Sequence, residues 1–224
     1  MTSPIFCAID TPDLDRAEIL AAQIKPYVGG LKLGLEFFLA HGVAGYHRMA
    51  QVGLPIFLDL KLHDIPNTVA GAIGSLLPLQ PAFMTIHASG GAAMMRAAKG
   101  QGGKAKLLAV TVLTSLDGDD LTQVGQGADT TQQVLRLAKL AQDNGMDGVI
   151  CSPEEIRSLR AALGKDFILM VPGIRPTWAA AQDQKRTMTP REAMQLAATY
   201  LVIGRPITGA ENPADAARKI AEDI

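Results

Sequence analysis

The feature that most constrains this chain is a repeated alternation between short runs of β-forming residues and stretches with helical spacing. The β-rich runs are residues 5–10 (IFCAID), 30–35 (GLKLGL), 55–61 (PIFLDLK), 82–88 (AFMTIHA), 106–114 (KLLAVTVLT), 147–152 (DGVICS), 166–173 (DFILMVPG) and 200–204 (YLVIG). Strands that alternate with helices indicate βαβ units, in which neighbouring strands run parallel. We therefore predict an α/β fold with a parallel sheet.

Residues 131–144 show the helical spacing most clearly. Apolar side chains recur there on one predicted helical face, at Val134, Leu137, Ala138 and Ala141. Thr130 is the predicted N-cap, and Gly145 is the predicted residue just beyond the C-terminal end.

A doubly wound open sheet and a closed (β/α)8 barrel both fit the alternation. An open nucleotide-binding sheet usually has a glycine-rich turn after its first strand, whereas this chain continues with Asp10, Thr11 and Pro12. No Pro-, Gly- or Ser-rich linker divides the chain, and barrels of about 200–250 residues commonly form one domain. We therefore predict a single-domain (β/α)8 TIM barrel over residues 1–224.

Polar residues gather where the predicted strands end. In a parallel barrel the carboxyl ends of the strands meet at one rim, and catalytic residues come from that rim. The strand ends contain Asp10, Lys32, Asp59, Lys61, His87, Thr114, Pro172 with Arg175, and Gly204 with Arg205. These side chains are too polar to serve only as packing at the end of the barrel, so they predict an active site.

Residues 57–68, FLDLKLHDIPNT, place charges at the end of an apolar strand. Asp59 and Lys61 are two residues apart and therefore point to the same face, and Asp64 follows three residues later. Burying an ion is costly unless partners compensate for it, and Lys32, Asp59 and Lys61 can compensate one another as an alternating network. From the spacing alone, both a structural ion pair and a catalytic cluster fit.

The overall charge argues against several kinds of partner. A formal net charge of −1 and a sequence pI near 6.4 offer no broad basic field, so we predict neither a nucleic-acid partner nor a membrane one. Cys7 and Cys151 lie far apart in apolar runs without metal-ligand spacing, which favours buried reduced thiols. Charged residues from Asp10 onward leave no room for a signal-peptide hydrophobic region, so we expect a cytoplasmic protein.

The motif DLKLHDIPNT (59–68) resembles the signature of the orotidine 5′-monophosphate decarboxylase family. Further similar segments follow in the family's order, namely AID (8–10), LKLGLEFF (31–38), AVTVLTS (109–115), PGIRP (172–176), DQKRTMTP (183–190) and IGRPIT (203–208). The resemblance implies a carbon–carbon lyase of pyrimidine biosynthesis that converts orotidine 5′-monophosphate to UMP and carbon dioxide without a cofactor or metal.

The resemblance also implies a role for individual residues. Lys61 would protonate carbon 6 of the pyrimidine, and Lys32, Asp59 and Asp64 would complete the charge network. Asp64 would reach in from the neighbouring subunit of a homodimer. The substrate-binding residues implied are Asp10 and the partner's Thr68 for the ribose, Thr114 in preference to Ser115 for the pyrimidine, and Arg175, Gln184, Gly204 and Arg205 for the phosphate end.

Two other functions fit parts of the sequence. Metal-dependent sugar-phosphate decarboxylases and aldolases share the Asp-x-Lys-x-x-Asp core, but they place a magnesium-binding glutamate on the second strand, where this chain has Lys32. A lysine repels a divalent cation at that position. A non-catalytic barrel that binds phosphorylated metabolites would keep IGRPIT, and the intact set of Asp59, Lys61 and Asp64 argues against it.

Overall fold

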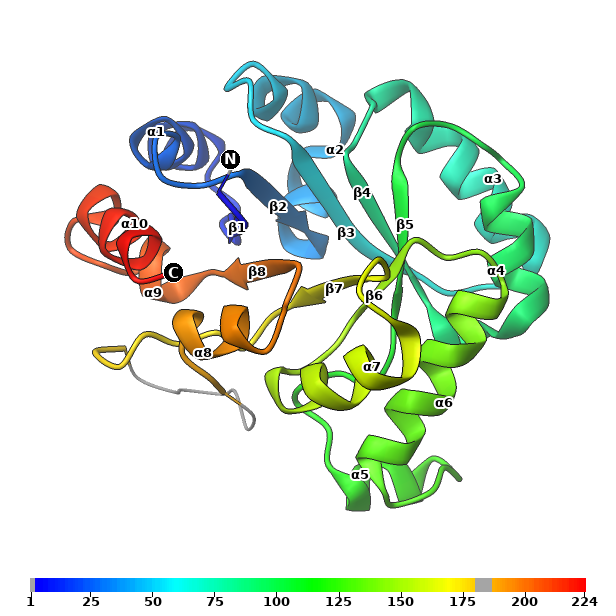
Figure 1. Ribbon diagram of the computed structural model, residues 1–224. Helices are drawn as coiled ribbons and strands as arrows, with labels where there is room; N and C mark the ends of the chain where they lie inside the picture. Colours follow the sequence, from blue (N-terminus) through cyan, green and yellow to red (C-terminus); the bar gives the residue numbers. More distant parts are fainter. Residues whose placement is uncertain (1–2, 180–186) are drawn as a thin grey trace.

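The computed structural model describes residues 3–179 and 187–224 and has a closed barrel of parallel strands (Figure 1). Each β-rich run coincides with one strand, and β3 extends one residue beyond its run. The strands are β1 Ile5–Ala8, β2 Gly30–Gly34, β3 Ile56–Leu62, β4 Phe83–His87, β5 Lys106–Val110, β6 Gly148–Ile150, β7 Ile168–Val171 and β8 Tyr200–Ile203. They pair in chain order and β8 closes on β1, which confirms the predicted (β/α)8 barrel.

Helices surround the barrel (Figure 1). The α-helices are α1 Leu14–Ile24, α2 Leu35–Ala50, α3 Pro66–Leu76, α4 Gly91–Lys99, α5 Gly118–Gln123, α6 Thr130–Asp143, α7 Ile156–Leu163, α8 Pro190–Gln195, α9 Arg205–Thr208 and α10 Pro213–Glu222. Short 3-10 turns are η1 Leu77–Leu79, η2 Ala88–Gly90 and η3 Pro153–Glu155. None of the helices in the described ranges is long and apolar enough to cross a membrane.

The strands are buried on both faces, which explains their nearly continuous apolar runs. The large core lies between the strands and the helices. A smaller aromatic cluster fills the barrel interior, where the ring of Phe6 packs edge-on against Phe83 and Tyr200 with centroids 5.4 Å away in each case. A Cβ at Gly30 would lie 2.2 Å from this Phe6 ring, so the interior packing requires glycine there.

Helix α6 matches the predicted stretch but begins differently from the prediction. Its N-cap is Asp129 rather than Thr130, because the Asp129 carboxylate accepts a hydrogen bond from the backbone N–H of Gln132 at 3.0 Å. Thr130 is the first helical residue. Gly145 follows the C-cap with a φ of +79°, which confirms its predicted place just beyond the helix.

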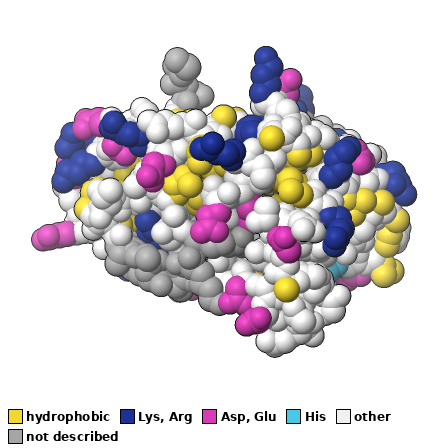
Figure 2. Space-filling view, turned by 60° about the horizontal axis from the view of Figure 1, so that its bottom comes forward, with side chains coloured by type: hydrophobic (Ala, Val, Ile, Leu, Met, Phe, Trp, Pro, Cys, Tyr) yellow, Lys and Arg dark blue, Asp and Glu magenta, His cyan; other side chains and the backbone are white. Residues whose placement is uncertain are grey.

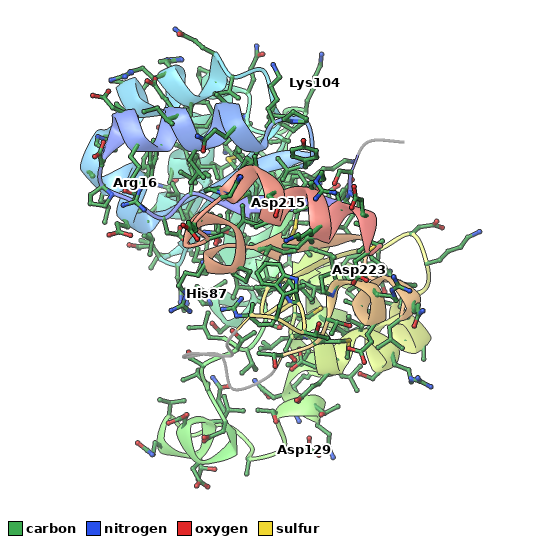
Figure 3. All side chains as sticks on the ribbon, turned by 90° about the vertical axis from the view of Figure 1, so that its left-hand side faces the viewer. Arg16, His87, Lys104, Asp129, Asp215 and Asp223 are labelled. Carbon is green, nitrogen blue, oxygen red and sulfur yellow. The ribbon has the colours of Figure 1, made fainter. Side chains whose placement is uncertain are left out.

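The chain after β5 leaves the barrel earlier than predicted. The strand ends at Val110, and beyond it the backbone N–H and the hydroxyl of Thr111 both donate to the carbonyl oxygen of Ile150, at 3.4 Å and 2.8 Å. The segment that carries α5 projects from the barrel in two perpendicular views (Figures 1 and 3). Thr114 therefore lies in a connection at the rim rather than at a strand end.

The described part of one molecular face carries both signs of charge. Figure 2 shows Lys and Arg side chains interspersed with Asp and Glu on that face. This mixture agrees with the net charge of −1.

Candidate active site

A cavity opens at the carboxyl ends of the barrel strands. Its volume is about 530 Å³, and its wall contains residues in or after seven of the eight strands, β4 being the exception among the described residues. The predicted site residues in the wall are Asp10, Lys32, Asp59, Lys61, Thr114, Arg175, Gly204 and Arg205. The barrel thus brings together residues that are far apart in the sequence.

Lys32, Asp59 and Lys61 form an alternating charge network in this wall. Lys61 Nζ donates to Asp59 Oδ2 at 2.6 Å, and Lys32 Nζ lies 3.7 Å from the same oxygen. Lys32 Nζ also donates to Asp10 Oδ1 at 3.1 Å. The exposed fraction is 9% for the Asp59 side chain and 28% for that of Lys61, so the Lys61 ammonium is the more accessible partner.

The buried carboxylate of Asp59 is held in its ionised form. Burial raises the pKa of this group, but the charges of Lys32 and Lys61 and the hydrogen bonds from Lys61 and Thr85 act against burial. Their combined effect lowers the pKa of Asp59 below its ordinary value. The site therefore keeps a negative charge directly beside two ammonium groups at neutral pH.

The end of β3 departs from regular strand geometry. Its register with β4 shifts between Leu58 and Leu62, and Lys61 within this bulge has a φ of +50°. A non-glycine residue in this left-handed region costs about 1–3 kcal/mol, and such strain is concentrated at functional sites. Such a bulge changes the direction in which a side chain at the rim points.

Thr85 on β4 is a buried member of the network that the sequence analysis missed. Its hydroxyl donates to Asp59 Oδ1 at 2.9 Å and accepts the backbone N–H of Lys61 at 2.9 Å. The available signal was a polar residue inside the apolar run FMTIH, two residues from Phe83 and therefore on the inward face.

Two arginines approach the opposite part of the cavity. Arg175 is only 9% exposed, and its Nη1 donates to the carbonyl oxygen of Ile174 at 2.9 Å. Within the described part of the chain, its buried Nε has no hydrogen-bond partner. Burial, followed by the charge of Arg205, lowers the pKa of Arg175. Two cations held this close make a region that favours an anion.

Two predicted site residues, Asp64 and Thr68, are not in the wall of the cavity. Asp64 follows β3 and Thr68 lies in α3, and both are exposed at the surface of their own chain. Asp64 Oδ1 accepts the backbone N–H of Ile65 at 2.6 Å. Gln184 lies outside the described residues.

A profile of the family described as "Orotidine 5'-phosphate decarboxylase / HUMPS family" matches residues 3–220. The chain belongs to this family. The family resemblance seen in the ordered sequence motifs is thereby confirmed.

Members of the decarboxylase family are similar to this chain over nearly its full length. An orotidine 5′-phosphate decarboxylase from Sphingopyxis alaskensis is 56% identical over 221 residues, which cover 98% of each chain. One from Rhodospirillum rubrum is 53% identical and covers 99% of this chain and 94% of its own. The crystal structure of orotidine 5′-phosphate decarboxylase from Lactobacillus acidophilus superposes with a TM-score of 0.87 at 37% identity, covering 99% of this chain and 98% of the other.

His63, within the decarboxylase-family motif, lies beside His87 at the end of β4. The rings of His63 and His87 are 5.5 Å apart, and His87 is labelled at the edge of the molecule in Figure 3. Burial lowers the pKa of His87, with further lowering by His63 and Lys61, so the imidazole is mostly neutral at pH 7. Within residues 3–179 and 187–224, no group of three or more His, Cys, Asp or Glu residues is arranged to hold a metal ion.

Other polar residues in the cavity wall were not predicted as site residues. These are Glu36 in the first turn of α2, Cys151 just after β6 and Thr208 at the end of α9. Glu36 and Thr208 lie within LKLGLEFF and IGRPIT, two of the segments that resemble the family, and Cys151 lies within the β-rich run DGVICS. Cys7 and Cys151 are both buried thiols, as predicted.

Proposed function

We propose that this chain is an orotidine 5′-phosphate decarboxylase, a carbon–carbon lyase that converts orotidine 5′-monophosphate to UMP and carbon dioxide in de novo pyrimidine biosynthesis. The observation that carries the proposal is the alternating network of Lys32, Asp59 and Lys61 in the wall of a 530 Å³ cavity. Membership of the family and the names of its relatives support the same activity.

The chemistry requires a cation beside the reacting carbon. Loss of carbon dioxide from carbon 6 of the pyrimidine leaves a carbanion in the ring plane, because the ring offers no electron sink for that orbital. The Lys61 ammonium stabilises this charge as it develops and then gives its proton to carbon 6. Lysine suits the task because it is a compact charge that can also release a proton.

Asp59 and Lys32 prepare Lys61 for this step. Asp59 lies beside the departing carboxylate and orients the Lys61 ammonium through the 2.6 Å hydrogen bond. Lys32 shares the Asp59 carboxylate and links it to Asp10. The Asp59 carboxylate therefore lies between the two lysines.

The ammonium alone does not supply the whole acceleration. A lysine about 4 Å from the developing charge contributes about 4 kcal/mol at an effective dielectric constant near 20. Enzymatic accelerations require about 8–23 kcal/mol. The remainder comes from the binding energy of the phosphate, which is used to orient the substrate and to exclude water.

The rest of the cavity matches the remaining parts of the nucleotide. Arg175, Arg205 and the backbone N–H of Gly204 bind the phosphate, together with Gln184. Asp10 binds the ribose. Thr114 binds the pyrimidine from the connection after β5. The pair of arginines at one end and the charge network at the other give the cavity the polarity that this substrate needs.

The site is completed by a second subunit of a homodimer. Asp64 and Thr68 are exposed and outside the cavity wall of their own chain, yet they belong to the same motif as Lys61. Ile65, which lies between them, is 67% exposed, and burial of this side chain in an interface is favourable. In the dimer, Asp64 and Thr68 of one subunit reach the ribose side of the other subunit's site.

The enzyme acts in the cytoplasm as a single domain over residues 1–224. It uses neither a cofactor nor a metal and has no nucleic-acid or membrane partner. Lys32 occupies the position where metal-dependent relatives need a glutamate, and a lysine there disfavours a divalent cation.

An absorbance assay tests the proposal directly. Purified protein is dialysed against EDTA and mixed with orotidine 5′-monophosphate, and the loss of substrate is followed together with the appearance of UMP. The expected result is turnover that is unchanged by the dialysis. No turnover, or turnover that appears only when Mg²⁺ is added, contradicts the proposed function.

A further inference from the structure

The hydroxyl of Thr85 connects the side chain of Asp59 to the backbone of Lys61. It donates its one proton to Asp59 Oδ1 at 2.9 Å and accepts the Lys61 N–H at 2.9 Å. Thr85 is 1% exposed, so no solvent can replace either bond. Asp59 and Lys61 on β3 therefore both depend on one buried oxygen, which belongs to Thr85 on β4.

The position of Thr85 in the sheet explains why this oxygen is needed. Met84 pairs with Leu58 and Ile86 pairs with Leu62, so Thr85 faces the bulged part of β3 that contains Asp59 and Lys61. A bulge leaves backbone groups without their ladder partners. The Thr85 side chain satisfies the N–H of Lys61, whose φ of +50° is unfavourable without such support.

The same hydroxyl fixes the rotation of the Asp59 carboxylate. Oδ1 is held by Thr85, which leaves Oδ2 facing Lys61 Nζ at 2.6 Å and Lys32 Nζ at 3.7 Å. Without the hydroxyl, the carboxylate loses its hydrogen bond from β4 and can rotate toward either lysine. The Lys61 ammonium would then lose its fixed direction.

We propose that Thr85 is a positioning residue of the decarboxylation, which holds the Asp59 carboxylate and the bulged Lys61 backbone in the geometry that aims the Lys61 ammonium. The proposal rests on the proposed function of this cavity. Thr85 does not contact the cavity and acts only through Asp59 and Lys61.

The test compares Thr85→Val with Thr85→Ser. Valine keeps the branched shape and removes the hydroxyl, whereas serine keeps the hydroxyl and removes a methyl group. We expect Thr85→Val to lower kcat by about 10- to 100-fold, since a buried donor and a buried acceptor lose their partner. Thr85→Ser should retain most of the wild-type kcat. The affinity for UMP, measured by calorimetry, should change little in both variants.

The pH dependence of kcat distinguishes positioning from a purely structural role. The hydrogen bond from Thr85 is one of the contacts that lower the pKa of Asp59. Its removal raises that pKa, so the acid side of the kcat profile should move to higher pH in Thr85→Val but not in Thr85→Ser. A residue that only supports the fold would lower the unfolding temperature without moving this profile.

Each outcome decides the proposal. If wild-type protein does not turn over orotidine 5′-monophosphate, the proposed function fails, and the role of Thr85 fails with it. If the wild type is active and Thr85→Val matches its kcat and pH profile per folded molecule, the role of Thr85 alone is wrong. If valine prevents folding, Thr85→Ala against Thr85→Ser gives the same comparison with a pair that differs by one oxygen, and equal kcat values there overturn the proposal.

Discussion

Asp59 shows at the scale of one residue how burial and charge combine in this site. Two ammonium groups and a hydroxyl outweigh its desolvation, and they hold its pKa below the ordinary value. A group with a lowered folded-state pKa stays ionised until the pH falls through that lowered value. The charge network should therefore stay intact well into the acid range.

The first residue-scale prediction concerns this pH range. Since an ordinary aspartate has a pKa of about 3.9, the kcat for orotidine 5′-monophosphate should stay level as the pH is lowered from about 8 to about 5. It should fall only as the pH approaches the lowered pKa of Asp59. The measurement is kcat at saturating substrate, and a loss of half the activity near pH 6 would contradict the lowered pKa.

The second residue-scale prediction concerns Arg205. Arg205→Ala should reduce kcat/KM for orotidine 5′-monophosphate by about 10- to 100-fold, because hydrogen bonds to a charged group contribute about 1.5–3 kcal/mol. The loss on orotidine, which lacks the phosphate, should be much smaller. Arg157→Ala, an exposed arginine on α7, is the matched control and should leave both substrates unaffected. Equal proportional losses on the two substrates would refute the role given to Arg205.

Most residues of the cavity wall were predictable because they end strands of a parallel barrel, where position along the chain fixes position on the rim. Thr85 was not, because its role depends on a two-residue shift in pairing between β3 and β4. The alternation of apolar and polar residues does not predict such a bulge. The family resemblance implied roles for Asp64 and Thr68, and neither lies in the cavity wall of its own chain.

At the scale of secondary-structure elements, Arg160 joins the end of α7 to two neighbouring connections. Its guanidinium donates to the carbonyl oxygens of Ala197 at 2.7 Å and Phe167 at 2.5 Å and to Thr199 Oγ1 at 2.6 Å. These acceptors lie just before β7 and β8. The residue thus ties a helix to the starts of two strands, at the end of the barrel away from the cavity.

Arg160→Met should destabilise the fold without changing the chemistry. Loss of these charge-assisted bonds should lower the free energy of unfolding by about 2–3 kcal/mol, measured by urea denaturation. The kcat of the folded protein should be unchanged, since Arg160 does not belong to the cavity wall. Arg157→Met on the same helix is the control. A stability equal to that of the control would show that the Arg160 contacts contribute nothing.

The elements themselves were largely predictable, and their ends were not. Each β-rich run overlapped one strand, with β3 extending one residue beyond its run, and the apolar stripe of α6 placed that helix correctly. The N-cap prediction failed because Asp129 and Thr130 are both good capping residues, and only the fold decides which one turns its oxygen toward Gln132. In the same way β5 stops at Val110 although apolar residues continue beyond it.

At the scale of the whole molecule, closure of the barrel follows from the number of strand–helix units and from the missing glycine-rich turn after β1. Assembly does not follow from one chain. Asp64 and Thr68 are exposed and lie outside the wall of their own cavity, so the proposed site needs a second copy of the chain. Because a two-fold interface uses the same surface on both subunits, each dimer would contain two shared sites.

Subunit mixing tests this sharing. Lys61→Ala and Asp64→Ala homodimers should each be nearly inactive. In a mixed dimer one site carries both substitutions and the other is native. Random exchange of equal amounts makes about half of the dimers mixed, so about a quarter of all sites should become native. If exchange is verified by mass and activity does not rise above that of the separate variants, Asp64 acts within its own subunit.

Turnover by Lys61→Ala is the most direct test of the charge network as the site of decarboxylation. Loss of about 4 kcal/mol of electrostatic stabilisation, together with the proton donor, should lower kcat for orotidine 5′-monophosphate by about 1,000-fold or more. UMP should still bind. Lys104→Ala, an exposed lysine just before β5 that lies far from His87 in Figure 3, should keep wild-type kcat. A Lys61→Ala protein that binds UMP and retains a kcat near that of the wild type would contradict the assignment of Lys61 as the acid.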